Sequence, residues 1–182
     1  MIRAFFALDL PDVLSWGCIE AQAALRQSLG NQEGVTLVPP HKLHLTLCFL
    51  GDTEENTLAS LVLDVKNAVK AWGEVLLQAR GLGGLPPRRP HVLSLFIEAN
   101  PRLLSLAAAL SQLGRNHGLL VEERAYLPHI TLARFKREEW ARLPENVALP
   151  LGGTSENLLL FSSTLAPGGA RHEVLARFSL RS

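Results

Sequence analysis

The chain has 182 residues, a formal net charge of +1 and an ordinary globular composition, with 47% hydrophobic and 19% charged residues. This near-neutral charge argues against a long basic track along nucleic acid, because such tracks need clustered lysine and arginine. The length suits one compact domain over residues 1–182, within which two lobes are possible. The two cysteines, Cys18 and Cys48, form neither a CxxC pair nor a disulfide framework, so we expect a cytoplasmic setting.

The chain opens with a predicted strand over residues 2–9, which are too short and too interrupted by charge for a signal peptide or a membrane span. We therefore expect no membrane segment there. A helix should follow from Pro11 to Gly30 and bury an apolar stripe on one face of a sheet. The expected stripe consists of Val13, Trp16, Gly17, Ala21, Ala24 and Leu25.

The next predicted elements are a strand over residues 42–50 and a helix that continues to about residue 71. Asp52 and Glu55 have the spacing of a capping box, which predicts that the helix begins between them. Strand and helix thus continue to alternate along the chain.

The second half of the chain has a similar plan. Further strands are predicted over residues 75–79, 92–97, 158–162 and 173–180. The Gly- and Pro-rich residues 81–90 indicate a hairpin or a crossover between lobes. Asn100 and Pro101 should begin a third helix that ends at Gly118. This order predicts an α+β fold of two duplicated lobes related by a pseudo-twofold axis.

One tetrapeptide pattern occurs twice, as residues 44–47 (His-Leu-Thr-Leu) and residues 129–132 (His-Ile-Thr-Leu). In an extended strand the histidine and the threonine of each copy share one face, while the aliphatic residues share the other. Two such strands that face one cleft would supply two imidazoles and two hydroxyls around one small anion. Either copy alone is typical of an ordinary half-buried strand, but two copies with the same parity favour phosphoryl chemistry.

Paired histidines can catalyse acid-base chemistry without a metal or another cofactor, because near neutral pH one imidazole accepts a proton while the other donates one. The hydroxyls of Thr46 and Thr131 can donate to phosphate oxygens. A zinc site would need three or four converging ligands, and neither tetrapeptide has a second ligand nearby, so we expect no metal.

These paired motifs resemble the signature of the 2H phosphoesterase superfamily. Residues 3–11, 43–51 and 128–134 resemble the bacterial RNA 2',3'-cyclic phosphodiesterases, formerly described as 2'-5' RNA ligases, and residues 85–90 and 171–180 extend the likeness over most of the chain.

The resemblance implies a bilobal fold of two antiparallel sheets around a central cleft, with helices outside. It also implies hydrolysis of an RNA-terminal 2',3'-cyclic phosphate to a 2'-phosphate, with His44 as the proton donor and His129 as the proton acceptor. The expected ligands are RNA ends or nucleotides that carry this group. We expect a monomer with no obligate protein partner.

Two alternatives stay open. The chain could cleave or join 2'-5' linkages, or it could be a non-catalytic module that binds RNA ends or nucleotides. Arg134 is a further candidate phosphate ligand, although in a regular strand it would point away from His129 unless a bulge turned it. His172 departs from the family, in which many relatives place an aromatic residue such as tyrosine.

Other chemically active residues have ordinary structural interpretations. Cys48 has the parity of His44, but a small buried thiol is the simpler interpretation. We expect Phe49 in the core, whereas Tyr126 could stack on a base. The remaining residues are expected on the surface or in structural roles, namely His41, His91, His117, Arg88 and Arg89.

Overall fold

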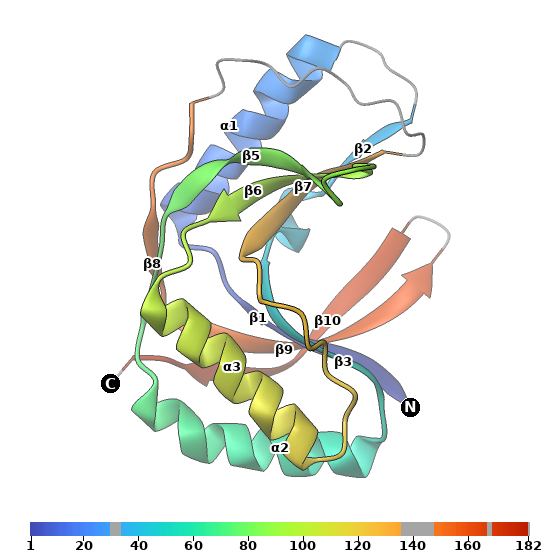
Figure 1. Ribbon diagram of the computed structural model, residues 1–182, viewed down its shortest axis with the longest axis vertical. Helices are drawn as coiled ribbons and strands as arrows, with labels where there is room; N and C mark the ends of the chain where they lie inside the picture. The colour runs from blue at the N-terminus through green and yellow to red at the C-terminus, as the bar shows by residue number, and fades with distance from the viewer. Residues whose placement is uncertain (30–33, 136–147, 167–168, 182) are drawn as a thin grey trace.

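The computed structural model describes residues 1–29, 34–135, 148–166 and 169–181 (Figure 1). Strands and helices alternate along the first two thirds of the chain, and a long hairpin follows at the end. The elements are β1 (Ile2–Leu8), α1 (Asp12–Leu29), β2 (Val35–Leu37), β3 (Leu45–Thr53), α2 (Glu55–Ala68), β4 (Val75–Leu77), β5 (Ala79–Leu85), β6 (Val92–Ile97), α3 (Pro101–Asn116), β7 (His129–Phe135), β8 (Gly153–Ser155), β9 (Asn157–Ala166) and β10 (Gly169–Ser179), with short 3-10 turns at Pro40–Lys42 and Val69–Ala71.

The large antiparallel sheet has two halves. One half has the order β10-β9-β1-β3, and the other has the order β7-β6-β5 with β2 paired to β7. The halves join where Leu45 of β3 pairs with Ile130 of β7. A separate two-stranded sheet consists of β4 and β8. The predicted α+β fold with antiparallel sheets is confirmed, and the sheets of the two lobes are continuous through the Leu45–Ile130 pair.

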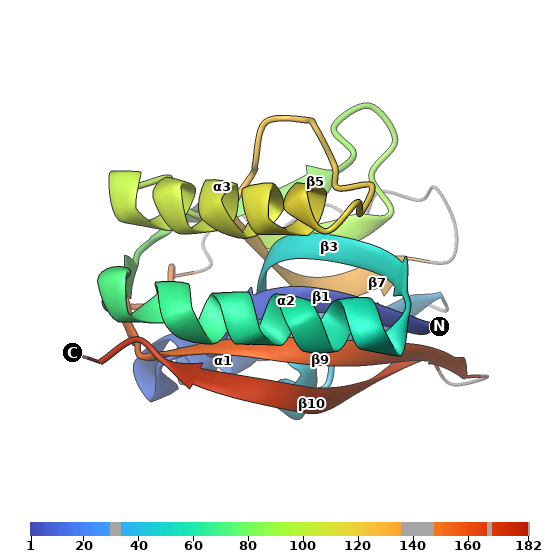
Figure 2. The ribbon, with the colours of Figure 1, turned by 90° about the horizontal axis from the view of Figure 1, so that it is seen from below.

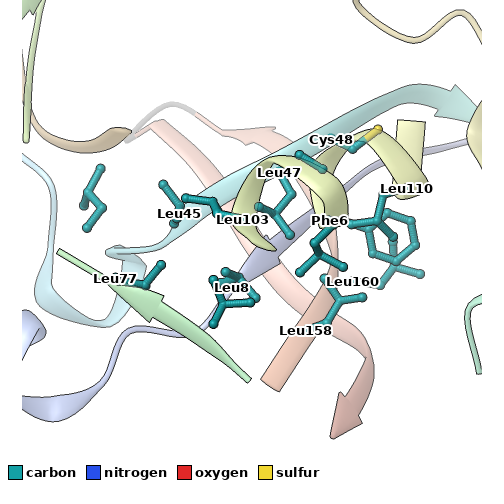
Figure 3. Packing of buried hydrophobic residues seen from close by; sticks show 14 of the residues in the cluster. Phe6, Leu8, Leu45, Leu47, Cys48, Leu77, Leu103, Leu110, Leu158 and Leu160 are labelled. Carbon is teal, nitrogen blue, oxygen red and sulfur yellow. The ribbon is translucent and has the colours of Figure 1, made fainter. Parts of the chain in front are cut away.

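Helices cover the outer side of each half (Figures 1 and 2). α1 packs against β7, whereas α2 and α3 pack on each other and α3 also lies against β3. The buried apolar side chains beneath the helices form a large cluster with members in both halves. Figure 3 shows Phe6, Leu45, Leu47, Leu110 and Leu160 among them. Because one face of β1 and β3 is buried in this cluster, the side chains of the opposite face are available for a functional site.

The apolar stripe predicted for α1 is wrong at the N-terminal end of the helix and confirmed at Ala21 and Leu25. Val13 is 51% exposed and Trp16 is 67% exposed. In the first half of the helix, Leu14 and Cys18 are buried in their place. Gly17 explains part of the shift, because a Cβ at this position would lie only 2.4 Å from the Cβ of Pro150. A close approach to a distant segment thus decides which way the helix faces.

The capping box predicted for α2 is also wrong. β3 continues through Asp52, which pairs with Arg3 of β1, and ends at Thr53. Glu54 is the N-cap of α2, and its side chain makes no capping hydrogen bond. Pairing with β1 therefore extends the strand past the local helix signal.

The remaining predictions hold with small changes. Residues 81–90 do form a hairpin between β5 and β6, although β5 itself continues as far as Leu85. α3 begins as predicted, because the side chain of Asn100 accepts a hydrogen bond from the backbone N–H of Leu103. The three-residue strands β2 and β8 have no clear signal in the sequence. Among the described residues, no helix combines the length and the hydropathy needed to cross a membrane.

Candidate functional site

The two His-x-Thr motifs lie side by side where the halves of the sheet meet. Leu45 and Ile130, the residues that follow the two histidines, are direct antiparallel partners. This register puts the histidine of each motif opposite the threonine of the other motif, on the same face of the sheet. We call this the motif face, and its four residues are His44, Thr46, His129 and Thr131. All four are partly buried, whereas Leu45 and Ile130 are fully buried on the reverse face.

Both imidazoles are held by the same backbone contact. His44 Nδ1 lies 2.8 Å from the carbonyl oxygen of Lys42, and His129 Nδ1 lies 2.8 Å from the carbonyl oxygen of Leu127. A carbonyl can only accept, so Nδ1 carries the hydrogen in each ring. The neutral imidazole therefore has an unprotonated Nε2 that can accept a proton, and the charged imidazole can donate one from the same atom.

A β-bulge follows each threonine. In β3 the register against β1 shifts between Thr46 and Cys48, and in β7 the register against β6 shifts between Thr131 and Ala133. Leu47 has no residue opposite it in β1, and Leu132 has none opposite it in β6. Each bulge reverses the alternation of side chains, so both the leucine and the residue after it are buried. The two strands thus share a local geometry that the repeated motif alone does not predict.

The bulge in β7 returns Arg134 to the motif face. In a regular strand this residue would point away from His129. The Arg134 side chain is exposed, and its charge lowers the pKa values of His44 and His172. A permanent cation therefore lies close enough to the paired imidazoles to attract an anion that binds between them.

The bulge in β3 separates Cys48 from the motif face. The Cys48 side chain is buried, and its Sγ lies 3.7 Å from the hydroxyl of Ser111 on α3. Phe49 takes the position in β3 that Arg134 takes in β7. Its side chain is 45% exposed and stacks on Phe5 with ring centroids 5.2 Å apart, so the prediction that Phe49 lies in the core is wrong.

An aromatic cluster surrounds His44. The ring centroid of His44 lies 5.1 Å from that of Phe5, 5.8 Å from Phe161 and 5.6 Å from His172. Phe161 comes from β9 and His172 from β10, at the edge of the sheet. His172 packs edge-on against both His44 and Phe5, and its Nδ1 is buried without a hydrogen-bond partner in the described part of the chain. His172 therefore belongs to the surroundings of His44.

These surroundings disfavour a positive charge on His44. Burial lowers the pKa of His44 from 6.5 to about 4, and the charges of His172, Arg134 and His129 act in the same direction. The hydrogen bond to the carbonyl of Lys42 opposes this shift. Burial also lowers the pKa of His172, and the charges of Lys42 and Arg134 add to that effect. The free protein therefore holds His44 as a neutral imidazole near pH 7.

A pocket of about 340 Å³ opens beside His44. Residues 41–44 line one side of it, and Phe161 with residues 171–173 lines the other. Lys42 is half-buried in this pocket and donates a hydrogen bond from Nζ to the carbonyl oxygen of Ala170, at 3.0 Å. The volume lies within the range of small-molecule sites, and the lining combines aromatic rings with basic groups.

The other candidates from the sequence do not join the motif face. The hydroxyl of Tyr126 donates to the carbonyl oxygen of Thr46 at 2.8 Å, and burial raises its pKa. Tyr126 therefore braces β3, and it is not free to stack on a base. His117 contacts Asp64 at 2.8 Å on the helical side of the molecule. His91, Arg88 and Arg89 lie on the exposed β5–β6 turn.

Three contributors to the site were not predicted from the sequence. Lys42 precedes the first motif and could have been weighed as a pocket residue. Phe5 and Phe161 approach His44 only because β1 and β9 pair beside β3, which no local pattern reveals. Over the described residues, no group of three or more His, Cys, Asp or Glu side chains is arranged to hold a metal ion.

Comparisons with known proteins agree on the family. The model of the 2'-5' RNA ligase superfamily matches residues 18–160. A Thermus thermophilus protein named RNA 2',3'-cyclic phosphodiesterase is 32% identical over 99% of this chain and 91% of its own length. A Thermotoga maritima protein of the same name is 28% identical over 96% of this chain and 93% of its own length.

Solved structures give the same result. A crystal structure of a Thermus thermophilus protein superposes with a TM-score of 0.86 and 31% identity over 100% of this chain and 99% of that one. Escherichia coli LigT in complex with 3'-AMP superposes with a TM-score of 0.80 and 26% identity over 100% of this chain and 99% of LigT. The region matched by the family model, residues 18–160, contains both His-x-Thr motifs, so the chain belongs to the 2'-5' RNA ligase superfamily, whose members are 2H phosphoesterases.

Proposed function

We propose that this chain is an RNA 2',3'-cyclic phosphodiesterase that opens the cyclic phosphate at an RNA end to a 2'-phosphate without a metal. One observation carries the proposal. Two imidazoles from paired strands each bind a backbone carbonyl through Nδ1 and each keep Nε2 for proton transfer. Relatives over nearly the whole chain are named for this reaction, which supports the same chemistry here.

The roles follow from the chemistry of ring opening. Water attacks phosphorus, and His129 Nε2 accepts the proton that the water loses. The bond between phosphorus and O3' breaks, and O3' takes a proton from His44 Nε2. The products are a 2'-phosphate and a free 3'-hydroxyl, and solvent restores the protonation of both imidazoles.

The threonines and Arg134 stabilise the phosphate as it reacts. The hydroxyls of Thr46 and Thr131 donate hydrogen bonds to the nonbridging oxygens from opposite strands. The guanidinium of Arg134 faces the same anion and adds a charge-assisted contact. The hydroxyls of Thr46 and Thr131 and the guanidinium of Arg134 make no hydrogen bonds to other described side chains. They can therefore bind the phosphate without breaking an existing hydrogen bond.

The lowered pKa of His44 constrains the timing of proton donation. A neutral His44 cannot donate, so the donor role requires that substrate binding raises its pKa. The negative charge of the cyclic phosphate does this, because an anion close to an imidazole favours the charged form. We propose that His44 takes up its proton as the anion binds and donates it as the ring opens.

Phosphorus NMR tests the reaction directly. The protein is incubated with a 2',3'-cyclic mononucleotide in the presence of a chelator, and the phosphate product is identified by its resonance. We expect the nucleoside 2'-phosphate as the product and no dependence on added metal. Release of the 3'-phosphate alone, or loss of turnover in the chelator, would contradict the proposal.

The name of the superfamily indicates a second candidate reaction, which is cleavage or joining of a 2'-5' linkage. The same imidazole pair would serve it, with the proton roles exchanged in the joining direction. Product analysis with a 2'-5'-linked dinucleotide distinguishes the two reactions. A non-catalytic binding module would bind nucleotide but would show no turnover with either substrate.

A further inference from the structure

The half-buried side chain of Lys42 has no anionic partner among the described residues. Its Nζ donates one hydrogen bond to the carbonyl oxygen of Ala170, and no carboxylate among the described residues forms a salt bridge with it. An ammonium has three hydrogens to donate, so two stay available. The charge of Lys42 also lowers the pKa of His172, which places it within electrostatic range of the aromatic cluster.

The surroundings of Lys42 are basic and aromatic. Arg171 lines the same pocket, is exposed, and makes no hydrogen bond or ion pair with other described residues. Glu173 supplies the single carboxylate among the lining residues. Phe161 and His172 contribute aromatic rings to the pocket lining, and both pack against His44. Cations beside aromatic rings are the combination that holds the backbone and the bases of single-stranded nucleic acids.

This pocket adjoins the proposed place of the cyclic phosphate at His44, which borders both. The reacting phosphate lies between His44 and β7, with the two threonines and Arg134. No residue of β7 lines the pocket, which extends from His44 toward the edge strand β10. An RNA end suits both places, because it carries a phosphodiester one nucleoside away from its terminal cyclic phosphate.

We propose that Lys42, assisted by Arg171, binds the phosphodiester on the 5' side of the terminal nucleotide, so that the enzyme prefers an RNA chain to a cyclic mononucleotide. This inference rests on the proposed function, since the cyclic phosphate defines which nucleotide is terminal. A 5'-phosphate on a single nucleotide carries more negative charge than a phosphodiester and could reach the same cation, so the experiment compares both sources.

The test measures affinity for reaction products by calorimetry, which does not depend on turnover. The ligands are a nucleoside 2'-phosphate, the same nucleotide with an added 5'-phosphate, and a dinucleotide that ends in a 2'-phosphate. We expect the wild-type protein to bind the dinucleotide about tenfold more tightly than the nucleoside 2'-phosphate, as one charge-assisted contact allows. Lys42→Met should remove most of this preference, and Arg171→Met should reduce it.

Two controls keep the result interpretable. Lys66→Met removes an exposed lysine of α2 outside the pocket and should leave the preference unchanged. Arg171→Met tests the same subsite through an exposed side chain, so a folding defect of Lys42→Met cannot decide the outcome. The dependence of log affinity on log salt for the dinucleotide should also fall by about 0.7 in Lys42→Met, the value for one lost phosphate contact on a single strand.

Equal affinity of the wild-type protein for the dinucleotide and the nucleoside 2'-phosphate would overturn the inference, as would an unchanged preference in both pocket variants. A preference for the 5'-phosphorylated mononucleotide over the dinucleotide would overturn the assignment to an RNA chain. A preserved dinucleotide preference without turnover of any cyclic substrate would support the subsite and contradict the proposed reaction, so the two failures are distinguishable.

Discussion

The two motif strands have the same backbone geometry and different surroundings. In both β3 and β7 the histidine binds the carbonyl two residues before it, and a bulge follows the threonine. His44 is surrounded by Phe5, Phe161 and His172. His129 has Phe96 of β6 as its cross-strand partner, and it takes part in no stacked or edge-on ring pair among the described residues. Five residues after the histidine, β3 has Phe49 and β7 has Arg134.

This difference shows how a repeated unit can supply two chemical roles. The backbone contacts are local, so each copy of the motif reproduces them. The surroundings come from other strands, so each copy meets a different environment. His44 lies in an aromatic cluster that disfavours its charge, whereas His129 lies on β7, the strand that also carries Arg134.

The largest expected effect comes from removing either imidazole. His44→Ala and His129→Ala should each lower kcat for a cyclic mononucleotide by about 10²- to 10⁴-fold, because each removes one proton transfer. Steady-state kinetics with purified, folded variants checks this. His91→Ala is the matched control, since His91 is exposed on the β5–β6 turn. Near wild-type turnover in either motif variant would show that its histidine is not required for proton transfer.

The residues five positions after the histidines should differ in their effect. Arg134→Met should lower kcat/KM by about tenfold to a hundredfold, since it removes a charge-assisted contact to the phosphate. Phe49→Leu removes no charge and should cost less than Arg134→Met. Both variants are compared on the same cyclic mononucleotide. A larger loss in Phe49→Leu would show that the aromatic residues near His44 contribute more to catalysis than the charge of Arg134.

The protonation of His44 should respond to an anion. NMR titration of the free protein should place the pKa of His44 near 4, well below the usual 6.5, because burial and nearby positive charge disfavour its charged form. A bound nucleoside 2'-phosphate should raise this pKa. A His44 that titrates normally in the free protein, or whose pKa falls when the nucleotide binds, would contradict the proposed donor role.

The same pKa shift predicts a dependence of stability on pH. The unfolded chain binds a proton at His44 near pH 6.5, whereas the folded protein resists it until about pH 4. The contribution of neutral His44 to the free energy of unfolding is therefore fully present above pH 6.5. It falls by about 2 to 3 kcal/mol as the pH drops toward 4. Urea unfolding across this range should show a weaker fall in His44→Gln. An identical fall in the variant would exclude His44 as the cause.

The smallest effect should come from the hydrogen bond between Tyr126 and the backbone of β3. Tyr126→Phe removes the hydroxyl that donates to the carbonyl oxygen of Thr46 and should lower the free energy of unfolding by about 1 kcal/mol. Urea unfolding measures this change. An unchanged midpoint would mean that another donor satisfies the carbonyl, and β3 would then be held without Tyr126.

The sequence predicted the features of the site that depend on local geometry. Strand alternation alone put each histidine on the same face as its threonine, and the fold class followed from the order of helices and strands. The two bulges could not be predicted, because a bulge is defined by the partner strand. Arg134 was therefore a candidate phosphate ligand only on the condition of a bulge, and Phe49 was expected in the core.

The environment of His44 was also beyond local sequence signals. Phe161 and His172 reach it from strands near the end of the chain, through the sheet order β10-β9-β1-β3. The close approach of Gly17 to Pro150 similarly sets the orientation of α1 and displaces the predicted apolar stripe. In each case a contact between distant segments outweighed a local pattern.

The central claim is that both motifs form one catalytic site, and the double variant His44→Ala/His129→Ala tests it most directly. If both imidazoles act on the same phosphate, each single variant loses nearly all activity, and the double variant is little worse than the worse single one. If each motif formed its own site, each single variant would keep about half of the activity and only the double variant would be inactive. The first pattern in kcat for a cyclic mononucleotide is the result we predict, and the second would contradict the account.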